Sequence, residues 1–145
     1  MNIIPNKDVK FRFIERKDLD EVFILLNQLT KIDYSNRNVD KCWEDFNSNT
    51  SSNSIVGIYK NKIIAYGSIV IENKIRGEKS GHIEDIVVDK NIRGNNIGVN
   101  LIRELVKIGK NHNCYRISLC CDESLIGFYS KNGFTPNDIT MKKYL

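Results

Sequence analysis

GHIEDIVVDKNIRGNNIG, which runs from Gly81 to Gly98, is the stretch of sequence that decides the fold. Residues 82–88 are rich in β-branched side chains and predict a strand. Residues 96–112 predict a helix, because apolar side chains recur on one face at helical spacing, namely Ile97, Leu101, Leu105 and Ile108. A strand that passes through a short turn into a long helix is therefore the central unit of the chain.

The turn between this strand and this helix has the composition of an anion-binding site. The first amides of a helix lack internal partners and point outward, and the helix dipole adds partial positive charge there. Gly94 and Gly98 let a ligand approach the backbone, Asn95 and Asn96 tolerate left-handed backbone angles, and Arg93 adds a fork of donors. These residues together suit a pyrophosphate. An ordinary loop containing glycine is the alternative, since neither GxGxxG nor GK[ST] is present.

The remaining elements alternate between strand and helix signals. Asp18 is predicted to cap the first helix, with Glu21 completing a capping box. Lys60-Asn61 predicts a hairpin turn. The expected strands are 10–14, 54–59, 62–72, 82–88, 114–121 and one within 134–144. One expected helix begins at residue 18, a second centres on 39–46, and two more span 96–112 and 124–132. The longer connections are 47–53 and 73–81. This order predicts a single α/β domain over residues 1–145, with a mixed central sheet and helices on both faces.

The composition narrows the class of protein. Of 145 residues, 41% are hydrophobic, which suffices for one buried core. No apolar run approaches the roughly 18 residues of a membrane span, and residues 1–10 lack the apolar centre of a signal peptide. We therefore expect a cytoplasmic protein that binds neither membrane nor nucleic acid. The net charge of +4 suits an anionic ligand.

The cysteines and histidines do not predict a metal site. Cysteine pairs at CxxC spacing are absent, and no carboxylate lies at ligand spacing from either histidine. Adjacent strand residues point to opposite faces, so two neighbouring cysteines would not share a metal. Buried free thiols are the expectation. The residues concerned are Cys42, Cys114, Cys120, Cys121, His82 and His112.

The chain resembles the GNAT acetyltransferase superfamily, whose signature is Q/R-x-x-G-x-G/A followed further on by an FY pair. The matching residues are Arg93 to Gly98 and Phe128-Tyr129. Three blocks, residues 81–88, 114–117 and 127–134, narrow the resemblance to the glucosamine-6-phosphate N-acetyltransferases. The resemblance extends over nearly the whole chain. It implies a GNAT-type fold, acetyl-CoA as co-substrate, a phosphosugar acceptor for UDP-N-acetylglucosamine synthesis, and a homodimer with shared active sites.

The resemblance also implies roles for single residues. The pantetheine arm of acetyl-CoA would lie along Ile86, Val87 and Val88, and its pyrophosphate at Arg93, Gly94, Asn95, Asn96, Ile97, Gly98 and Val99. The sugar and its amine would face Glu84 and Asp85. The sugar phosphate would lie near Thr30, Lys74, Ile75, Arg76 and either Lys142 or Lys143, one of which the partner subunit would supply.

Three residues depart from the family pattern. Asn96 replaces the middle glycine of the signature, Cys120 stands where the family has an acid, and Leu125 stands where many members have a cofactor-contacting asparagine. The change at Cys120 leaves the assignment of the base open, and the change at Leu125 would weaken cofactor binding.

Acetyl transfer to an amine requires a neutral amine, a polarised thioester carbonyl and a stabilised leaving thiolate. Glu84 is the predicted base, the amide of Ile86 or a near neighbour the predicted donor to the carbonyl, and Tyr129 the predicted proton donor to the sulfur. Backbone carbonyls near Cys120 would orient the amine; Cys120 as a nucleophile is the alternative. Two other functions stay open: a GNAT enzyme for a polyamine or a protein N-terminus, and a non-catalytic acetyl-CoA-binding module.

Overall fold

The computed structural model of the protein describes residues 4–92 and 96–145. Within these residues the strands form one five-stranded sheet in the order β1-β2-β3-β4-β5. The first four strands are antiparallel neighbours and β5 runs parallel to β4, so the sheet is mixed, as predicted. The strands are β1 (Lys10–Phe13), β2 (Ser52–Tyr59), β3 (Lys62–Asn73), β4 (Lys79–Val88) and β5 (Arg116–Leu119).

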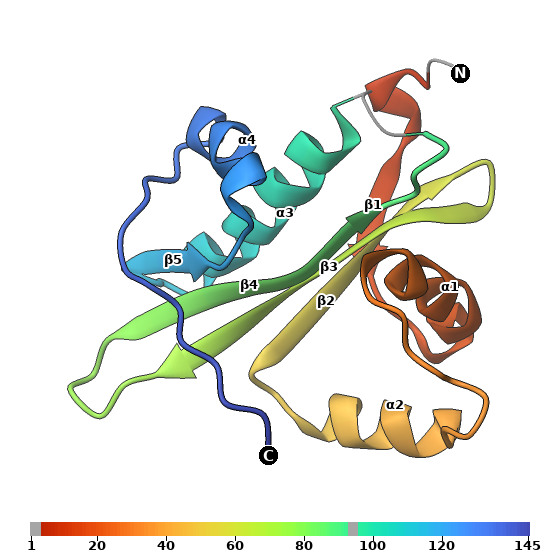
Figure 1. Ribbon diagram of the computed structural model, residues 1–145, viewed down its shortest axis with the longest axis horizontal. Coiled ribbons are helices and arrows are strands. Elements are labelled where there is room, and N and C mark those ends of the chain that lie inside the picture. Colours follow the sequence, from red (N-terminus) through yellow and green to blue (C-terminus); the bar gives the residue numbers. More distant parts are fainter. Residues whose placement is uncertain (1–3, 93–95) are drawn as a thin grey trace.

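Helices cover both faces of this sheet, which confirms the predicted layers (Figure 1). On one face Val22 and Leu25 of α1 pack with Val56 and Val87. On the other face the apolar side of α3 packs against residues such as Ile69. The helices are α1 (Leu19–Leu29), α2 (Val39–Ser48), α3 (Ile97–Asn111) and α4 (Ile126–Lys131), with short 3₁₀ turns at Asn6–Asp8, Arg16–Asp18 and Glu123–Leu125.

The hairpin between β2 and β3 turns at Lys60 and Asn61, as predicted. Their φ angles are 47° and 62°, and they lie between the paired residues Tyr59 and Lys62. Positive φ at both central residues is typical of a type I′ turn, whose twist matches that of the strands.

The predicted capping box at Asp18 and Glu21 is wrong. The chain enters α1 through the 3₁₀ turn, so Asp18 is already helical, and its side chain caps nothing in α1. Its carboxylate instead accepts hydrogen bonds from Arg12 Nη1 and Nη2 at 2.6 and 2.8 Å and from the amide of Glu15 at 2.7 Å. Glu21 Oε2 accepts from the amide of Ile63 at 2.9 Å, which ties α1 to the start of β3.

The predicted last strand is also wrong, since residues 134–145 form no strand. A strand needs a neighbour whose backbone groups it can pair with. The edge strand β5 is only four residues long and offers little ladder to extend. Ile139 and Met141 are both 91% exposed. These two apolar side chains therefore lie on no covered face of the part of the chain that the structure describes.

Three connections differ in length from the prediction. β4 begins at Lys79, because the antiparallel ladder with β3 continues to the hairpin and leaves only 74–78 as the connection. α2 and β2 leave only 49–51 between them. β5 does not include Cys114, whose amide bonds to Gly109 O at 3.0 Å in the turn that ends α3, and it stops at Leu119.

Asp18→Asn is expected to lower the free energy of unfolding by about 2 kcal/mol at neutral pH, because charge-assisted hydrogen bonds to Arg12 are lost at a nearly buried position. The Asp18 side chain is 4% exposed. Burial raises the pKa of Asp18, but hydrogen bonds from Arg12 and the Glu15 amide outweigh burial and hold it below the ordinary 3.8. This stabilisation is present above the ordinary pKa and is lost as the pH falls through the lower, folded pKa.

Urea denaturation of both proteins at neutral pH and in strong acid tests this prediction. The difference between them is expected to shrink in acid. Asp45→Asn is the matched control, since Asp45 is 67% exposed and meets Lys41 at 3.2 Å. Surface pairs of this kind contribute about 0–1 kcal/mol. Equal losses in the two variants would contradict the special role of Asp18.

Candidate active site

The ladder between β3 and β4 is interrupted by a bulge. Gly67 alone lies opposite two residues of β4, Asp85 and Ile86, between the regular pairs Tyr66–Val87 and Ser68–Glu84. Asp85 has φ of 54°, a left-handed angle that is uncommon outside glycine. A bulge leaves its extra residue outside the ladder and bends the strand, and bulges are frequent beside active sites.

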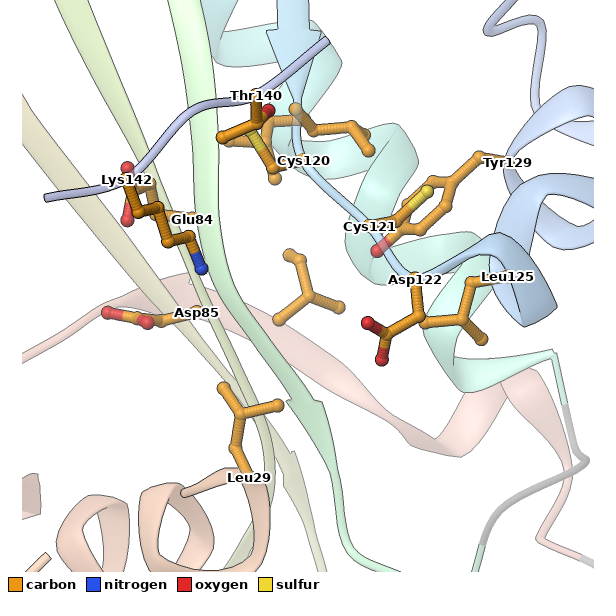
Figure 2. A pocket seen from close by; sticks show the side chains of 13 residues that line it. Leu29, Glu84, Asp85, Cys120, Cys121, Asp122, Leu125, Tyr129, Thr140 and Lys142 are labelled. Carbon is orange, nitrogen blue, oxygen red and sulfur yellow. The ribbon is translucent and has the colours of Figure 1, made fainter. Parts of the chain in front are cut away.

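On its other side, β4 runs beyond its ladder with β5. The parallel pairing ends at Ile83 and Leu119, whereas β4 continues to Val88. A cavity of about 520 Å³ lies at this point of divergence, between β4, the end of β5 and α4 (Figure 2). It is lined by Leu29, Ile83, Glu84, Asp85, Ile86, Leu119, Cys120, Cys121, Asp122, Leu125, Tyr129, Thr140 and Lys142.

Two adjacent carboxylates, Glu84 and Asp85, line one wall of the cavity. Burial raises the pKa of Asp85, and the charge of Glu84 raises it further. Like charges side by side favour the protonation of one of them. The pair can therefore hold an incoming amine and take up its proton.

Tyr129, from α4, lines the opposite wall, as Figure 2 shows. Its ring is 8% exposed and packs edge-on against Phe128 and Phe134, at centroid distances of 5.0 and 6.0 Å. Burial raises the pKa of the Tyr129 phenol, and Cys121 raises it further. The phenol therefore keeps its proton at neutral pH and can donate it.

The cysteines at the end of β5 are exposed, which corrects the expectation of buried thiols. Cys120 and Cys121 both line the cavity, because β5 stops at Leu119 and the chain after it no longer alternates between sheet faces. Cys120 Sγ lies 3.0 Å from Thr140 Oγ1 in the C-terminal segment. Cys42 and Cys114 are half-buried, and none of the four forms a disulfide.

The predicted pyrophosphate site is described only in part. Arg93, Gly94 and Asn95 lie outside the described residues. Asn96 has φ of 56°, which confirms the predicted left-handed angle, and α3 begins directly after it at Ile97. A Cβ added at Gly98 would lie 3.4 Å from the Phe128 ring, so α4 packs closely on the first turn of α3. Val99 follows within that turn, and none of residues 96–99 is among the lining residues of the cavity.

The predicted phosphate ligands are not gathered within one chain. Lys74 Nζ bonds to Glu72 Oε2 at 2.9 Å, and Arg76 bonds to Glu78 and to Tyr115 Oη, all around the β3–β4 hairpin (Figure 1). Ile75 is fully exposed at the same hairpin. None of residues 74–76 lines the cavity.

The other predicted substrate ligands flank the cavity. Thr30 ends α1 next to Leu29, which lines the cavity, and Lys142 lines it directly, whereas Lys143 does not. Val87 and Val88 continue β4 past the lining residue Ile86. The structure thus brings five predicted site residues together around one cavity: Glu84, Asp85, Ile86, Cys120 and Tyr129. Residues 74–76 lie outside this group.

Sequence reasoning missed five lining residues, namely Leu29, Ile83, Leu119, Asp122 and Thr140. Leu29 precedes the predicted ligand Thr30, and Asp122 follows the cysteine pair, so adjacency was the available signal. Thr140 carried no signal, because the C-terminal segment had been assigned to a strand. In the described ranges no group of three or more His, Cys, Asp and Glu side chains is arranged for a metal, and no helix there combines the length and apolar character needed to cross a membrane.

Comparison of the sequence with known proteins identifies the family of the chain. The acetyltransferase (GNAT) family model matches residues 19–134. A glucosamine 6-phosphate N-acetyltransferase 1 from Dictyostelium discoideum is 35% identical over 151 residues, covering 100% of this chain and 96% of that protein. A glucosamine 6-phosphate N-acetyltransferase from Arabidopsis thaliana is 35% identical over 142 residues, covering 93% and 95%.

Solved structures agree with the sequence matches. The crystal structure of glucosamine-6-phosphate N-acetyltransferase from Arabidopsis thaliana superposes with a TM-score of 0.86 at 35% identity, covering 94% of this chain and 97% of that one. A putative acetyltransferase from Agrobacterium tumefaciens has a TM-score of 0.87 at 19% identity over 94% and 99% of the two chains, a likeness of fold alone. The chain therefore belongs to the GNAT acetyltransferase family, among its glucosamine 6-phosphate N-acetyltransferases.

Proposed function

We propose that the protein transfers the acetyl group of acetyl-CoA to the amine of D-glucosamine 6-phosphate, giving N-acetyl-D-glucosamine 6-phosphate and CoA. The observation that carries the proposal is one cavity in which the β4 bulge, two carboxylates and a protonated phenol meet. Relatives with this activity in their names, matched over nearly the full chain, support the substrate. The step would supply UDP-N-acetylglucosamine synthesis in the cytoplasm.

Acetyl-CoA would bind where β4 continues beyond the end of its pairing with β5. The strand edge at the bulge carries backbone groups that are not engaged with β5, and these suit the amides of a pantetheine arm inserted like a short strand. The N-terminus of α3 follows β4 closely, with its outward amides at the end where the pyrophosphate would lie. Ile86 has its backbone at the bulge, where an amide can polarise the thioester carbonyl.

The chemistry needs two proton transfers. The neutral sugar amine attacks the thioester carbon, the carbon–sulfur bond breaks, and the proton lost by nitrogen passes to Glu84. Tyr129, on the opposite wall, gives its proton to the departing thiolate. Cys120 provides no carboxylate, so its part is confined to backbone contacts that orient the amine.

The phosphate group requires a second subunit. Among the lining residues that the structure describes, Lys142 is the single cation, beside Glu84, Asp85 and Asp122. We infer a homodimer in which the β3–β4 hairpin of one subunit brings Lys74 and Arg76 to the cavity of the other. In such a dimer their present partners, Glu72 and Glu78, would be exchanged in part for the phosphate.

The acidic lining also favours a second candidate, an acetyltransferase for polyamines. Three carboxylates against one lysine would attract a polycation in a single chain. The two candidates therefore differ in whether basic residues from a partner complete the site.

The first test measures CoA thiol release from acetyl-CoA with four acceptors: glucosamine 6-phosphate, glucosamine, spermidine and a peptide. We expect the phosphorylated sugar to exceed glucosamine in kcat/KM by at least about 100-fold, since an ion-paired phosphate contributes about 3 kcal/mol. Preference for spermidine would instead support the second candidate. Acetyl-CoA binding without turnover on any amine would instead support a non-catalytic acetyl-CoA-binding module.

Tyr129→Phe is expected to lower kcat about 100-fold, because the leaving thiolate loses its proton donor while the aromatic packing is kept. The dissociation constant of acetyl-CoA, measured by calorimetry, should change less than about twofold. Tyr59→Phe is the control, since Tyr59 ends β2 outside the cavity lining. An unchanged kcat in Tyr129→Phe would remove Tyr129 from the mechanism.

Sharing of the site between subunits is tested with differently tagged heterodimers. One subunit carries Glu84→Gln and the other carries Lys74→Ala with Arg76→Ala, and each homodimer alone should be nearly inactive. If the hairpin acts across the interface, the heterodimer has one intact site of two and about half of the wild-type activity. An inactive heterodimer that still binds acetyl-CoA would show that these residues do not act across the interface.

A further inference from the structure

The C-terminal segment, residues 134–145, passes along the cavity without forming a helix or a strand. Ile139 and Met141 are both 91% exposed, whereas Thr140 and Lys142 line the cavity. This alternation is that of an extended chain, whose successive side chains point to opposite sides. Thr140 and Lys142 therefore lie on the inner side of the segment, so a contact that holds Thr140 also directs Lys142.

A hydrogen bond holds this inner side to the body of the domain. Cys120 Sγ lies 3.0 Å from Thr140 Oγ1, and Figure 2 shows the two side chains meeting. Among the described residues, this is the one hydrogen bond that joins 135–145 to the rest of the chain. The bond between Asn137 and Asp138 is internal to the segment. The position of the segment therefore depends on the contact at Cys120.

The anchor of this bond is firm, although the bond itself is weak. A thiol and a hydroxyl each carry one proton and can also accept, so either group can donate. Cys120 directly follows Leu119, the last residue of β5, which is paired with Ile83 of β4. The thiol is thus carried by the edge of the sheet. In the proposed proton transfers Cys120 takes part through its backbone alone, which leaves its side chain for Thr140.

Lys142 is the charged group that this contact directs. Its side chain lies on the side of the cavity where Glu84 and Asp85 lie, as Figure 2 shows. Lys74 and Arg76 are paired with carboxylates of their own hairpin, whereas Lys142 forms no ion pair with any residue that the structure describes. An ammonium group of this kind suits an anionic substituent of the acceptor. Because a lysine side chain is flexible, anchoring its backbone limits the positions that the ammonium group samples.

We propose that Cys120 and Thr140 form a latch that positions Lys142 of the same chain for the phosphate group of the acceptor. The proposal rests on the proposed function for the identity of that acceptor. Cys120 and Thr140 are positioning residues, since they act through Lys142 and not on the reacting atoms. The latch assigns Lys142 to the cavity of its own subunit, in contrast to the hairpin residues that a partner would supply.

The kinetic test compares glucosamine 6-phosphate with glucosamine, which has no phosphate. Thr140→Val keeps the shape of the side chain but removes the hydroxyl. It should lower the ratio of kcat/KM between the two sugars about two- to fivefold, through KM, because one weak hydrogen bond is lost. Cys120→Ala should have the same effect. Lys142→Ala should lower that ratio about 10- to 100-fold, since a charge-assisted bond to the phosphate is lost.

Conservative and double variants separate the latch from general damage. Thr140→Ser and Cys120→Ser each keep a hydroxyl at the contact and should preserve the ratio. Thr140→Val combined with Lys142→Ala should be no worse than Lys142→Ala alone, because the effect of Thr140 passes through the lysine. Thr50→Val is the matched control, since Thr50 is exposed and lies outside the cavity lining. Thermal melts report whether each variant is folded.

Heterodimers test which cavity Lys142 serves. One subunit carries Glu84→Gln and the other carries Lys142→Ala. If Lys142 acts in its own chain, neither site is complete, and activity on the phosphorylated sugar should not exceed about half of that of the Lys142→Ala homodimer. About half of the wild-type activity would show that Lys142 acts across the interface and would overturn the assignment.

Limited proteolysis reports the latch without any substrate. Trypsin cleaves after lysine, so cleavage at Lys142 and Lys143, followed by mass spectrometry, measures how firmly the segment is held. Thr140→Val should speed this cleavage about two- to fivefold, because the protease acts on the released segment. Thr140→Ser and Thr50→Val should leave the rate as in the wild type.

The outcomes distinguish the latch from the function on which it rests. Unchanged trypsin cleavage in Thr140→Val, equal losses on the two sugars, or additive losses with Lys142→Ala would each overturn the latch. A lower ratio that serine restores, together with faster cleavage, would support it. A wild-type protein without turnover on glucosamine 6-phosphate would overturn the proposed function and the role of Lys142 toward phosphate, while the cleavage rates would still decide whether Cys120 holds the segment.

Discussion

The close approach of β3, β4 and α3 at Gly67 is the constraint on which the site depends. A Cβ at this position would lie 2.7 Å from Ile86 Cδ1 and 3.0 Å from Leu105 Cδ1, so only glycine leaves room for both side chains. Gly67 is also the single residue that faces the bulged pair Asp85 and Ile86. The packing of α3 on the sheet and the local shape of β4 are thus determined at one point. Without that bulge, Glu84 and Asp85 would follow the regular alternation of the strand, and the cavity wall would lose its paired carboxylates.

This constraint explains which predictions from sequence succeed. The apolar periodicity of 97–108 and the β-branched run of 82–88 predict α3 and β4, because burial of a continuous face stabilises both elements. Lys60-Asn61 predicts its turn, since left-handed angles are a local requirement. The bulge itself leaves no periodic signal, because it is a matter of register between two strands. The residues around it were assigned only through the family resemblance.

The failures share a physical cause, which is dependence on a distant partner. The sequence predicts that Asp18 caps a helix, yet in the structure its carboxylate accepts hydrogen bonds from Arg12 of the preceding strand. Residues 134–145 read as a strand, yet the edge strand β5 offers only four residues to pair with. Cys120 and Cys121 read as buried, yet β5 ends before them. Thr140 reaches the cavity only because the chain end crosses back over it, as Figure 2 shows.

The arrangement of protons in the cavity follows from where each group is buried. Burial and the neighbouring charge of Glu84 raise the pKa of Asp85, which favours the protonated form of that carboxyl group. Glu84, on the same wall, is the carboxylate that we propose receives the proton of the amine. On the opposite wall, burial raises the pKa of Tyr129, which keeps its proton available for the sulfur. Separate environments on the two walls thus divide proton acceptance from proton donation, which is the division that acyl transfer between an amine and a thioester requires.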